Sequence, residues 1–500
     1  MQVVRVGHSP HEHGKDIIAI ASDGGTHAYQ LKTGDLDLKG LEKHHSQIVA
    51  LVESAVDHPA VTGQSWHHPH LVISGTMSPP AADRLRTYNA GWKKRRYNAV
   101  QLVTGSQLIA KFSKMAANFW PQSPRDSRSF LGLYLADAVS ALDRDAFVGV
   151  IAGVVATENR LTKSETLRRL AAANLFASYA LAPFYSKANH WEVIQGWTIT
   201  AAYIAWAAER ARLSAASWKA SFRLAVNAAL EALSLLASEI IEPKALYPPG
   251  FELDQITRSR STICAGVVAT KILLELQQGT RWREEQRAKA LIEDMISRER
   301  FFPWGESAVP FFMMMIWALD KLRADQFSDG ILLRTISIIA HINSRLNAPK
   351  LPPPYDSADE ANAKLLRRQL NGEKQLDTRA AAAYTLEPLV TIAARRLWRN
   401  TLASIWKQIS RIGLLRLVPD IPRDILLWRW NYKSGVEQSR LYDTPQSWRQ
   451  LLIEARRSDE HLLPRVLRDN FDFALLFVLC YPHRFATPLI KYLDESIRKI

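Results

Sequence analysis

The chain has 500 residues, of which 47% are apolar and 23% charged, so it has room for roughly two to four domains and a large buried core. Its two cysteines, Cys264 and Cys480, exclude a disulfide-stapled scaffold and a zinc site built from cysteines. Lys and Arg outnumber Asp and Glu by 64 to 49. This surplus of positive charge either attracts a polyanion such as nucleic acid or only keeps the surface soluble.

The sequence predicts no membrane-spanning segment. The first residues, MQVVRVGHSPHEHGKD, lack the apolar core of a signal peptide. The longest uncharged runs, residues 171–186 and 193–208, are shorter than the ~18–20 residues that a spanning helix needs. We therefore expect a soluble, cytoplasmic protein with no membrane partner.

Residues 1–118 predict an α/β domain. The expected elements are, in order, strands at 16–21 and 27–32, a helix at 36–56, a strand at 71–74, a helix at 79–96, a strand at 99–104 and a helix at 106–118. The turn signal Asp23-Gly24-Gly25 makes the first two strands a hairpin. Because helices connect the later strands, we expect these strands to be parallel and covered by helices.

From about Phe119 onward the pattern predicts an all-α region in three parts. Residues 119–347 form a helical domain. Residues 348–378 are rich in proline and then in charge, which is typical of a linker or a long loop. Residues 379–500 form a basic, Trp-rich helical domain with 20 basic and 12 acidic residues; its tryptophans either fill a core or grip nucleic acid.

Three polar residues mark the predicted hairpin. Asp16 begins its first strand, and Gln30 and Lys32 lie two apart on its second strand, so they point to the same face. A carboxylate and an amide oxygen are hard ligands suited to Mg²⁺, which keeps several waters and binds phosphate oxygens. A neighbouring lysine can orient or deprotonate water and stabilise a pentavalent phosphate. Together these groups predict metal-dependent hydrolysis of a phosphodiester.

The strings Gly14-Lys15-Asp16-Ile17-Ile18-Ala19 and Tyr29-Gln30-Leu31-Lys32 resemble the D…QxK variant of the PD-(D/E)xK nuclease motif, which is typical of Mrr-type restriction endonucleases. Residues 71–81 resemble the third core strand and the helix start that follows it. Residues 100–109 resemble the last strand and helix. The resemblance covers residues 1–118, under a quarter of the chain.

The resemblance implies a restriction-endonuclease-like fold and assigns three catalytic residues. Asp16 would be the metal-binding carboxylate, Gln30 would replace the usual second acid as a metal ligand, and Lys32 would be the catalytic lysine. The cofactor would be Mg²⁺, with Mn²⁺ as an alternative. The family usually begins with a helix that carries a glutamate, and this chain begins almost at the first strand; Glu12 is not at the helical position.

Two other groups of residues are candidates. The second helix of the first region ends with four basic residues, Lys93, Lys94, Arg95 and Arg96. Their positive charges either stabilise the C-terminus of the helix or contact phosphate. Ten of the 14 histidines lie in residues 1–118. Those at positions 8, 11, 13, 67, 68 and 70 stand beside prolines and are expected in exposed loops, with a zinc site as the alternative.

The sequence as a whole favours a metal-dependent deoxyribonuclease in prokaryotic restriction or anti-phage defence. DNA is the expected partner, a co-encoded defence protein and a second copy of the chain are further candidates, and the helical part would sense, recognise DNA or oligomerise. Two alternatives stay open. The first is an inactive nuclease-like module that binds nucleic acid, and the second is a helical scaffold that docks a protein partner. No P-loop string is present, so a motor would be a separate protein.

Overall fold

The computed structural model divides the chain into two compact units, residues 1–120 and 121–500. The residues that it describes are 2–5, 14–21, 24–56, 66–116, 124–155, 161–242, 254–280, 282–297, 308–322, 325–344, 382–383, 386–396, 398–409, 413–418, 421–428, 436–440, 447–457, 460–481 and 487–500. The predicted linker at 348–378 lies outside these residues. The two segments predicted as separate helical domains, 119–347 and 379–500, both belong to the second unit.

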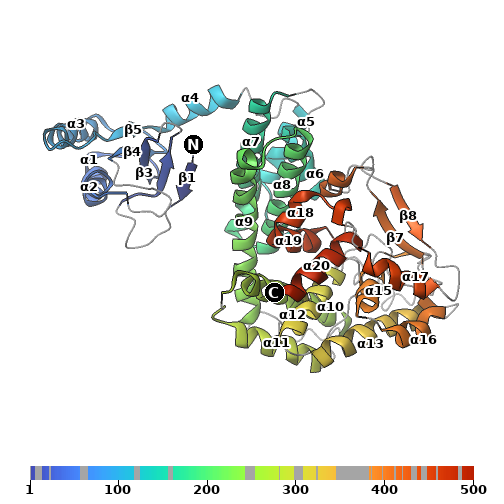
Figure 1. Cartoon of the computed structure of the whole chain (residues 1–500). Coiled ribbons are helices and arrows are strands. Elements are labelled where there is room, and N and C mark those ends of the chain that lie inside the picture. Colours follow the sequence, from blue (N-terminus) through green and yellow to red (C-terminus); the bar gives the residue numbers. More distant parts are fainter. Residues whose placement is uncertain are drawn as a thin grey trace, which may run out of the picture. The chain divides into compact units, whose positions relative to one another are not determined.

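The first unit is a five-stranded mixed sheet with helices, in the order β1-β2-β3-β4-β5 (Figure 1). Its elements are β1 (Gln2–Arg5), β2 (Ile17–Ile20), β3 (Thr26–Lys32), α1 (Leu38–Lys43), α2 (His45–Glu53), β4 (His67–Ile73), α3 (Pro79–Lys94), β5 (Gln101–Val103) and α4 (Gly105–Ala116). The hairpin β2–β3 is antiparallel, and β3–β4 and β4–β5 are parallel. The predicted hairpin and the predicted parallel pairing are confirmed.

The strands differ from the prediction at two places. Strand β1 was not predicted; it pairs antiparallel with β2, with Val3 opposite Ala19. Strand β4 begins at His67 rather than Leu71, so His67, His68 and His70 lie on a strand and not in a loop. Pro69 lacks an N–H group, but β5 pairs only with residues 70–72, so Pro69 disrupts no pairing with β5.

Helices α1, α2 and α3 cover one face of this sheet. Leu71 and Ile73 of β4 pack in one core with Leu41 of α1, Ile48 of α2 and Leu85 of α3, all at most 4% exposed. Side chains alternate between the faces of a strand, so Gln30 and Lys32 point to the same face as Ala28, which packs on α2. The candidate catalytic side chains therefore lie on the helix-covered face.

The second unit is largely helical. Its helices are α5 (Pro124–Tyr134), α6 (Arg144–Val155), α7 (Lys163–Ser186), α8 (His190–Arg210), α9 (Ala215–Ile241), α10 (Asp254–Gln278), α11 (Glu285–Ser297), α12 (Val309–Lys321), α13 (Asp325–Ser344), α15 (Leu386–Arg395), α16 (Arg399–Ile409), α17 (Ser447–Arg456), α18 (Arg465–Asp469), α19 (Phe471–Cys480) and α20 (Thr487–Lys499), with the 3₁₀ turns η2 (Pro422–Leu426) and η4 (Glu460–Leu462). A capping box between Thr162 and Glu165 begins α7.

This unit is not all-α, which corrects the prediction. Strands β6 (Ala382–Ala383), β7 (Gly413–Val418) and β8 (Val436–Arg440) form a three-stranded sheet. Strand β7 is an apolar run of the kind that fits either a strand or a buried helix, and β8 is polar. Neither strand has an alternating pattern clear enough to be recognised.

Three helices form the centre of the second unit. Residues 193–208 of α8 are buried on every side, as are residues 309–319 of α12 and 473–480 of α19. A helix that is apolar all round is a core helix; α8 packs against α6, α7, α9 and α19. Among the described residues one helix, α9, is long and apolar enough to cross a membrane, with a mean hydropathy of 1.6, and 44% of that stretch is buried in the protein.

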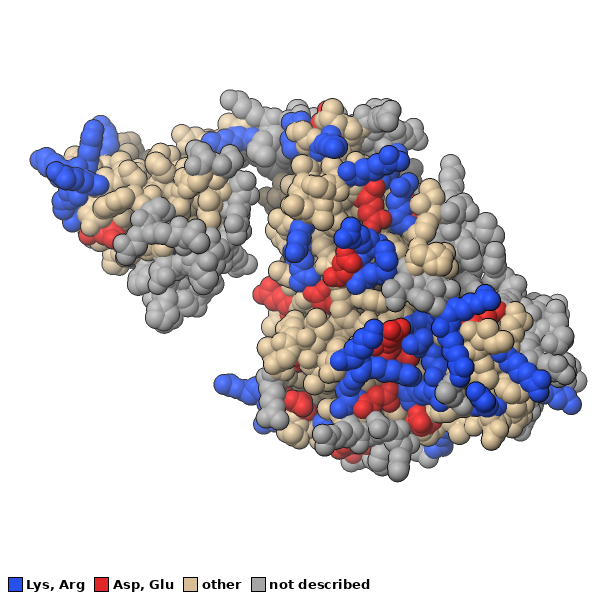
Figure 2. Space-filling view, in the orientation of Figure 1, with Lys and Arg blue, Asp and Glu red and all other residues tan. Residues whose placement is uncertain are grey.

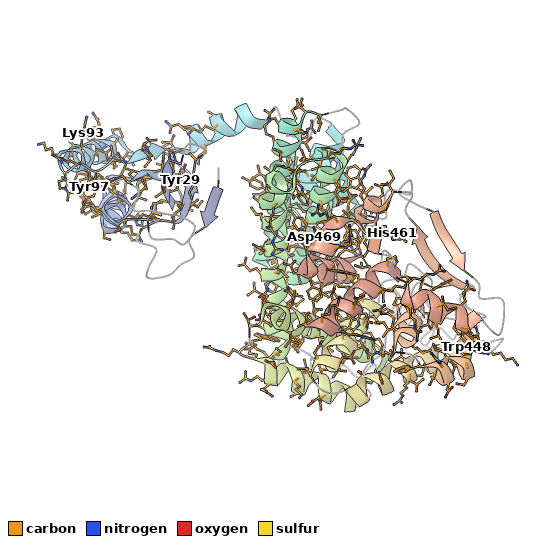
Figure 3. The ribbon with its side chains drawn as sticks, viewed as in Figure 1. Tyr29, Lys93, Tyr97, Trp448, His461 and Asp469 are labelled. Carbon is orange, nitrogen blue, oxygen red and sulfur yellow. The ribbon has the colours of Figure 1, made fainter. Side chains whose placement is uncertain are left out.

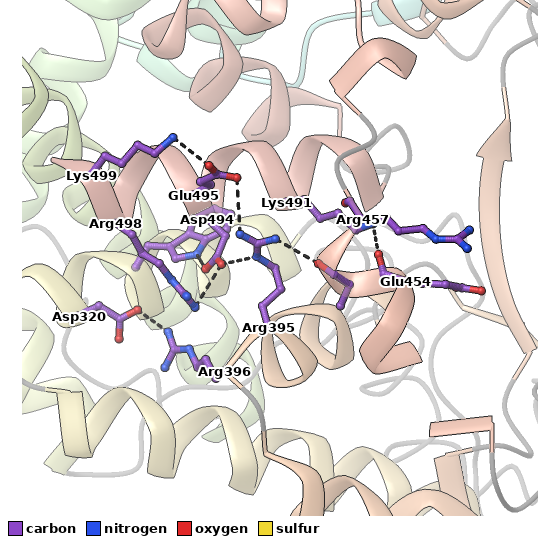
Figure 4. Close-up of polar contacts among 12 residues, drawn as sticks. Asp320, Arg395, Arg396, Glu454, Arg457, Lys491, Asp494, Glu495, Arg498 and Lys499 are labelled. Atoms are coloured by element: carbon purple, nitrogen blue, oxygen red, sulfur yellow. Dashed lines mark hydrogen bonds and ion pairs between the residues drawn. The ribbon is translucent and has the colours of Figure 1, made fainter. Parts of the chain in front are cut away.

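A buried polar network joins the early and late helices of this unit (Figure 4). Asp494 of α20 is 1% exposed and accepts hydrogen bonds from Arg395 Nε of α15 at 2.6 Å and from Trp317 Nε1 of α12 at 3.2 Å. Arg396 pairs with Asp320 and Asp329. Burial raises the pKa of Asp320, against the opposing effect of Arg396. Arg395 and Arg396 thus hold two parts of the unit together.

Candidate active site

The structure brings the three predicted catalytic residues together. Asp16 Oδ2 accepts hydrogen bonds from Gln30 Nε2 at 2.7 Å and from the backbone N–H of Leu31 at 2.6 Å. Lys32 lies close enough to Asp16 for the carboxylate to favour its charged form. Gln30 is 4% exposed, whereas Asp16 and Lys32 are half-buried and reach solvent.

Backbone pairing explains why these residues meet. The N–H of Asp16 donates to the carbonyl of Tyr29 at 2.8 Å, so Asp16 lies immediately before β2 and beside the end of β3. Strands β3, β4 and β5 run parallel, so this edge of the sheet is their carboxyl end. Open sheets of this kind bind ligands at that edge.

A glycine fixes the approach of the chain to Asp16. Gly14 has a φ of +71°, a conformation that glycine adopts without strain. A Cβ atom there would stand 2.3 Å from the carbonyl oxygen of Gln47 on α2. The turn before β2 therefore needs glycine for its backbone angle and for its close contact with α2.

Helix α2 supplies a partner for Lys32 that the sequence did not indicate. Lys32 Nζ donates to Gln47 Oε1 at 2.6 Å. His44, at the junction of α1 and α2, bonds to Gln47, and burial together with Lys32 and Lys43 lowers its pKa. Burial lowers the pKa of Lys32 as well, and Asp16 opposes that shift. A lysine with a lowered pKa is better suited to proton transfer near neutral pH.

The loops at this edge are tied to one another. Asp35 Oδ1 accepts hydrogen bonds from the backbone N–H of Thr76 at 2.6 Å and from its hydroxyl at 2.8 Å. These bonds lower the pKa of Asp35. Gly34 N–H donates to Ser74 Oγ at 2.7 Å. The loops after β3 and β4 are thereby held in place beside Lys32.

The donor set at the site fits Mg²⁺ with few protein ligands. Asp16 Oδ1 has no hydrogen bond from any described residue, and Gln30 Oε1 is the second side-chain oxygen. Mg²⁺ prefers oxygen ligands and usually keeps several waters beside one or two carboxylates. No group of three His, Cys, Asp or Glu side chains suited to a metal occurs in the part of the chain that the structure describes. Asp16 and Gln30 are the residues that would hold the ion.

A buried lysine beside the site predicts a pH dependence of stability. Lys15 is 2% exposed and donates to the carbonyl of Ala50 at 3.3 Å. Burial lowers its pKa from 10.5 to about 8. The unfolded chain therefore binds more protons between pH 8 and 10.5, and stability should rise with pH across that window by up to about 3 kcal/mol.

The difference between Lys15→Met and the parent isolates this effect. We expect Lys15→Met to unfold at a higher temperature at pH 7, with the gain shrinking to nothing by pH 10.5. The carbonyl of Ala50 keeps its bond from Ser54 N–H at 3.1 Å in the variant. Calorimetry of the full chain measures the gain, with exposed Lys39→Met as the control. A gain that is the same at both pH values would contradict the assignment.

The basic run Lys93 to Arg96 does not join the site. Helix α3 begins at the carboxyl edge of the sheet and runs for 16 residues, about 24 Å, to the opposite edge. All four side chains are exposed, and Figure 2 shows Lys and Arg gathered there. In Figure 3, Lys93 and Tyr97 lie at the end of the unit that is far from Tyr29 of β3. Arg95 pairs with Glu53 at 2.7 Å, which also accepts from Trp92 Nε1 at 2.9 Å.

Lys93 and Lys94 have no ion pair with any described residue, so we expect them to contact phosphate. Each phosphate contact contributes about 0.9 to the slope of log K against log salt concentration. Changing both lysines to glutamine should therefore weaken DNA binding and lower the slope by about 1.8. Mobility shifts at several salt concentrations measure it. The control is the double variant Arg84→Gln with Arg86→Gln, because these two cations of α3 are already paired with acids. Equal salt slopes in the two double variants would reject the phosphate contact.

Two histidines of β4 contact neighbouring elements of the first unit. His67 Nε2 lies 2.6 Å from the carbonyl oxygen of Leu51, and His70 Nε2 lies 3.0 Å from His27 Nδ1. Burial, with the positive groups His27, His68 and Lys111, lowers the pKa of His70 to about 4. His70 is therefore neutral at physiological pH. The histidines at positions 8, 11 and 13 lie outside the described residues.

Comparison of the chain with models of protein families, with curated protein sequences and with solved structures finds no match. The PD-(D/E)xK motif is therefore a resemblance carried by Asp16, Gln30 and Lys32.

Proposed function

We propose that the chain is a cytoplasmic, Mg²⁺-dependent endonuclease that hydrolyses phosphodiester bonds of DNA. The observation that carries the proposal is the convergence of Asp16, Gln30 and Lys32 on one face, at the carboxyl edge of the sheet. Asp16 lies 14 residues before Gln30 and 16 before Lys32 in the sequence, and the pairing of β2 with β3 brings it beside them.

Each residue has a distinct task in this reaction. Asp16 and Gln30 present oxygen ligands, and the N–H groups of Gln30 and Leu31 hold the carboxylate in one orientation. A bound Mg²⁺ supplies Lewis acidity to the phosphate and a more acidic water. Lys32 donates to the attacking water or to a phosphate oxygen, and Gln47 orients its ammonium.

The second unit contributes recognition in this proposal. The family resemblance favours a setting in prokaryotic defence, with the helical unit as sensor, DNA-recognition element or site of self-association. The surplus charge of residues 379–500, 20 basic against 12 acidic, would attract DNA. Part of that charge is structural, since the Arg395 and Arg396 side chains are only 14% and 10% exposed and are paired with acids. Removing residues 379–500 would expose the core around α12, so substitution of exposed cations is the better test.

One observation favours a second candidate, an inactive nuclease-like module that binds nucleic acid. Asp16 is the one carboxylate among the three candidate residues, and two N–H groups already occupy its Oδ2. A single carboxylate binds Mg²⁺ more weakly than a pair.

Cleavage and binding of plasmid DNA by the full chain separate the two candidates. We expect binding with or without metal, and nicking or cutting only when Mg²⁺ or Mn²⁺ is present. EDTA should abolish cutting and leave binding in place. Tight binding with no cutting in any divalent metal would reject the enzyme and favour the module. Purification with a co-encoded protein and no affinity for DNA would favour a scaffold.

A further inference from the structure

A cavity in the second unit has no part in the proposed nuclease chemistry. It has a volume of about 530 Å³ and lies between the junction of α8 with α9, the turn η2 and the segment from η4 to α18. Figure 3 labels Asp469, one of its lining residues, on α18. The volume is within the 300–1,000 Å³ range of small-molecule sites.

One wall of the cavity is aromatic and rigid. Trp218 and Phe222 of α9 meet edge to face, with ring centroids 5.4 Å apart. Phe222 is 1% exposed, so it fixes the half-exposed Trp218 from below. Pro422 and Pro464 stand in the lining as well. Such a wall suits a planar ring, because aromatic groups stack at little entropic cost.

Both carboxylates of the cavity already accept a hydrogen bond. Asp469 Oδ2 accepts from Arg465 Nε at 2.9 Å. Glu209 accepts from the backbone N–H of Val466, and burial raises its pKa against the opposing effects of that bond and of Arg423 and Arg468. Neither acid therefore repels an anion with its full charge.

More cationic than acidic side chains line the cavity. Lys219, Arg423 and Arg465 line it, against Glu209 and Asp469. Arg423 Nε is buried and has no hydrogen-bond partner among the described residues. Its neighbour Asp424 lies 3.7 Å away and already accepts from Trp206 Nε1 at 2.9 Å. Nε itself has almost no accessible surface, but the Arg423 side chain is 30% exposed, so its Nη groups are the ones that would donate to an anion in the cavity.

We infer that this cavity binds a small anion that carries a planar aromatic ring, the chemistry of a nucleoside monophosphate. The ring stacks on Trp218, and the phosphate takes hydrogen bonds from Arg423 and Lys219. The inference is independent of the nuclease proposal, since these residues belong to the second unit and Asp16, Gln30 and Lys32 belong to the first.

Calorimetric titration of the full chain with AMP tests the site. We expect saturable binding, and at least tenfold weaker binding of ribose 5-phosphate, which lacks the ring, and of adenosine, which lacks the anion. Trp218→Leu and Arg423→Gln should each weaken AMP at least tenfold, and Arg168→Gln, an exposed arginine of α7, should not. Circular dichroism checks that the variants fold.

If Arg423→Gln unfolds, Lys219→Gln still tests the site. Lys219 is exposed, so its loss should leave the fold intact and weaken the binding of AMP. Lys163→Gln, which changes another exposed lysine, is its control. The inference is overturned if AMP does not bind at millimolar concentration. It is equally overturned if adenosine or ribose 5-phosphate binds as tightly as AMP, or if Lys219→Gln binds AMP like the parent.

Discussion

Replacing Lys32 by methionine should slow the cleavage of plasmid DNA by about 10²- to 10⁴-fold, the usual contribution of a positioned proton donor or acceptor. Methionine keeps the unbranched stem and loses the ammonium that contacts Gln47. Initial rates of nicking at saturating Mg²⁺ measure the loss. Lys39→Met removes an exposed lysine of α1 in the same unit and should cut like the parent. Equal rates for Lys32→Met and Lys39→Met would show that Lys32 has no role in the reaction.

The Gln30→Glu variant tests whether Gln30 is a metal ligand or only a structural amide beside Asp16. The change restores the acid that is usual at this motif position, so the variant should keep activity and need less Mg²⁺ for half its maximal rate. It also places a carboxylate against Asp16, where the amide N–H now stands at 2.7 Å. Without metal the two charges repel, and Mg²⁺ should raise the unfolding temperature of Gln30→Glu more than that of the parent. A folded, wholly inactive variant would count against a metal role for Gln30.

The second large effect is on stability and concerns Asp494. Asp494→Asn removes the charge that faces Arg395, whose side chain is 14% exposed, and Arg498 at 3.2 Å. Breaking one side of a buried ion pair typically costs about 3–5 kcal/mol. We expect a value near 3 kcal/mol, since Arg395 Nη1 keeps its bond to the carbonyl of Ala455 at 3.1 Å.

The neighbouring residue Glu495 provides the control for this prediction. Its side chain is 48% exposed, pairs with Lys499 at 2.8 Å and lies at the 4.0 Å limit of an ion pair with Arg395, so Glu495→Gln should cost under about 1 kcal/mol. Denaturant unfolding of the two variants gives both free energies. Equal values would mean that the network around Asp494 does not hold α12, α15 and α20 together.

The first unit was predictable because its signals are local. A turn signal between two short apolar runs marks a hairpin. The helical spacing of apolar residues in 36–56 predicted one helix, which the structure divides at His44 into α1 and α2. The start of β4 was not predictable, because a run of histidines around a proline has low strand propensity and extends only through its pairing with β3. Strands β7 and β8 were missed for the same reason: their pairing partner, and not their own sequence, decides their conformation.

The candidate site was predictable to the extent that it follows strand geometry. Alternation places Gln30 and Lys32 on one face, and the hairpin brings Asp16 beside them. Gln47 and His44 gave no signal, because a polar residue on the exposed side of a helix has no distinctive pattern. Their contacts with Lys32 depend on how α2 crosses the sheet. The separation of Lys93 and Lys94 from the site likewise follows from the length of α3 and not from their sequence.

The measurement that tests the nuclease proposal most directly is the Mg²⁺-dependent cleavage rate of Asp16→Asn beside that of the parent, at matched DNA occupancy. Asparagine keeps the size of the side chain and an oxygen for the N–H of Leu31, so the variant should fold and bind DNA like the parent. The proposal predicts cleavage by the parent and none detectable by Asp16→Asn at any Mg²⁺ or Mn²⁺ concentration. Cleavage by Asp16→Asn at the parental rate would place the reaction elsewhere, and no cleavage by the parent would contradict the enzyme itself.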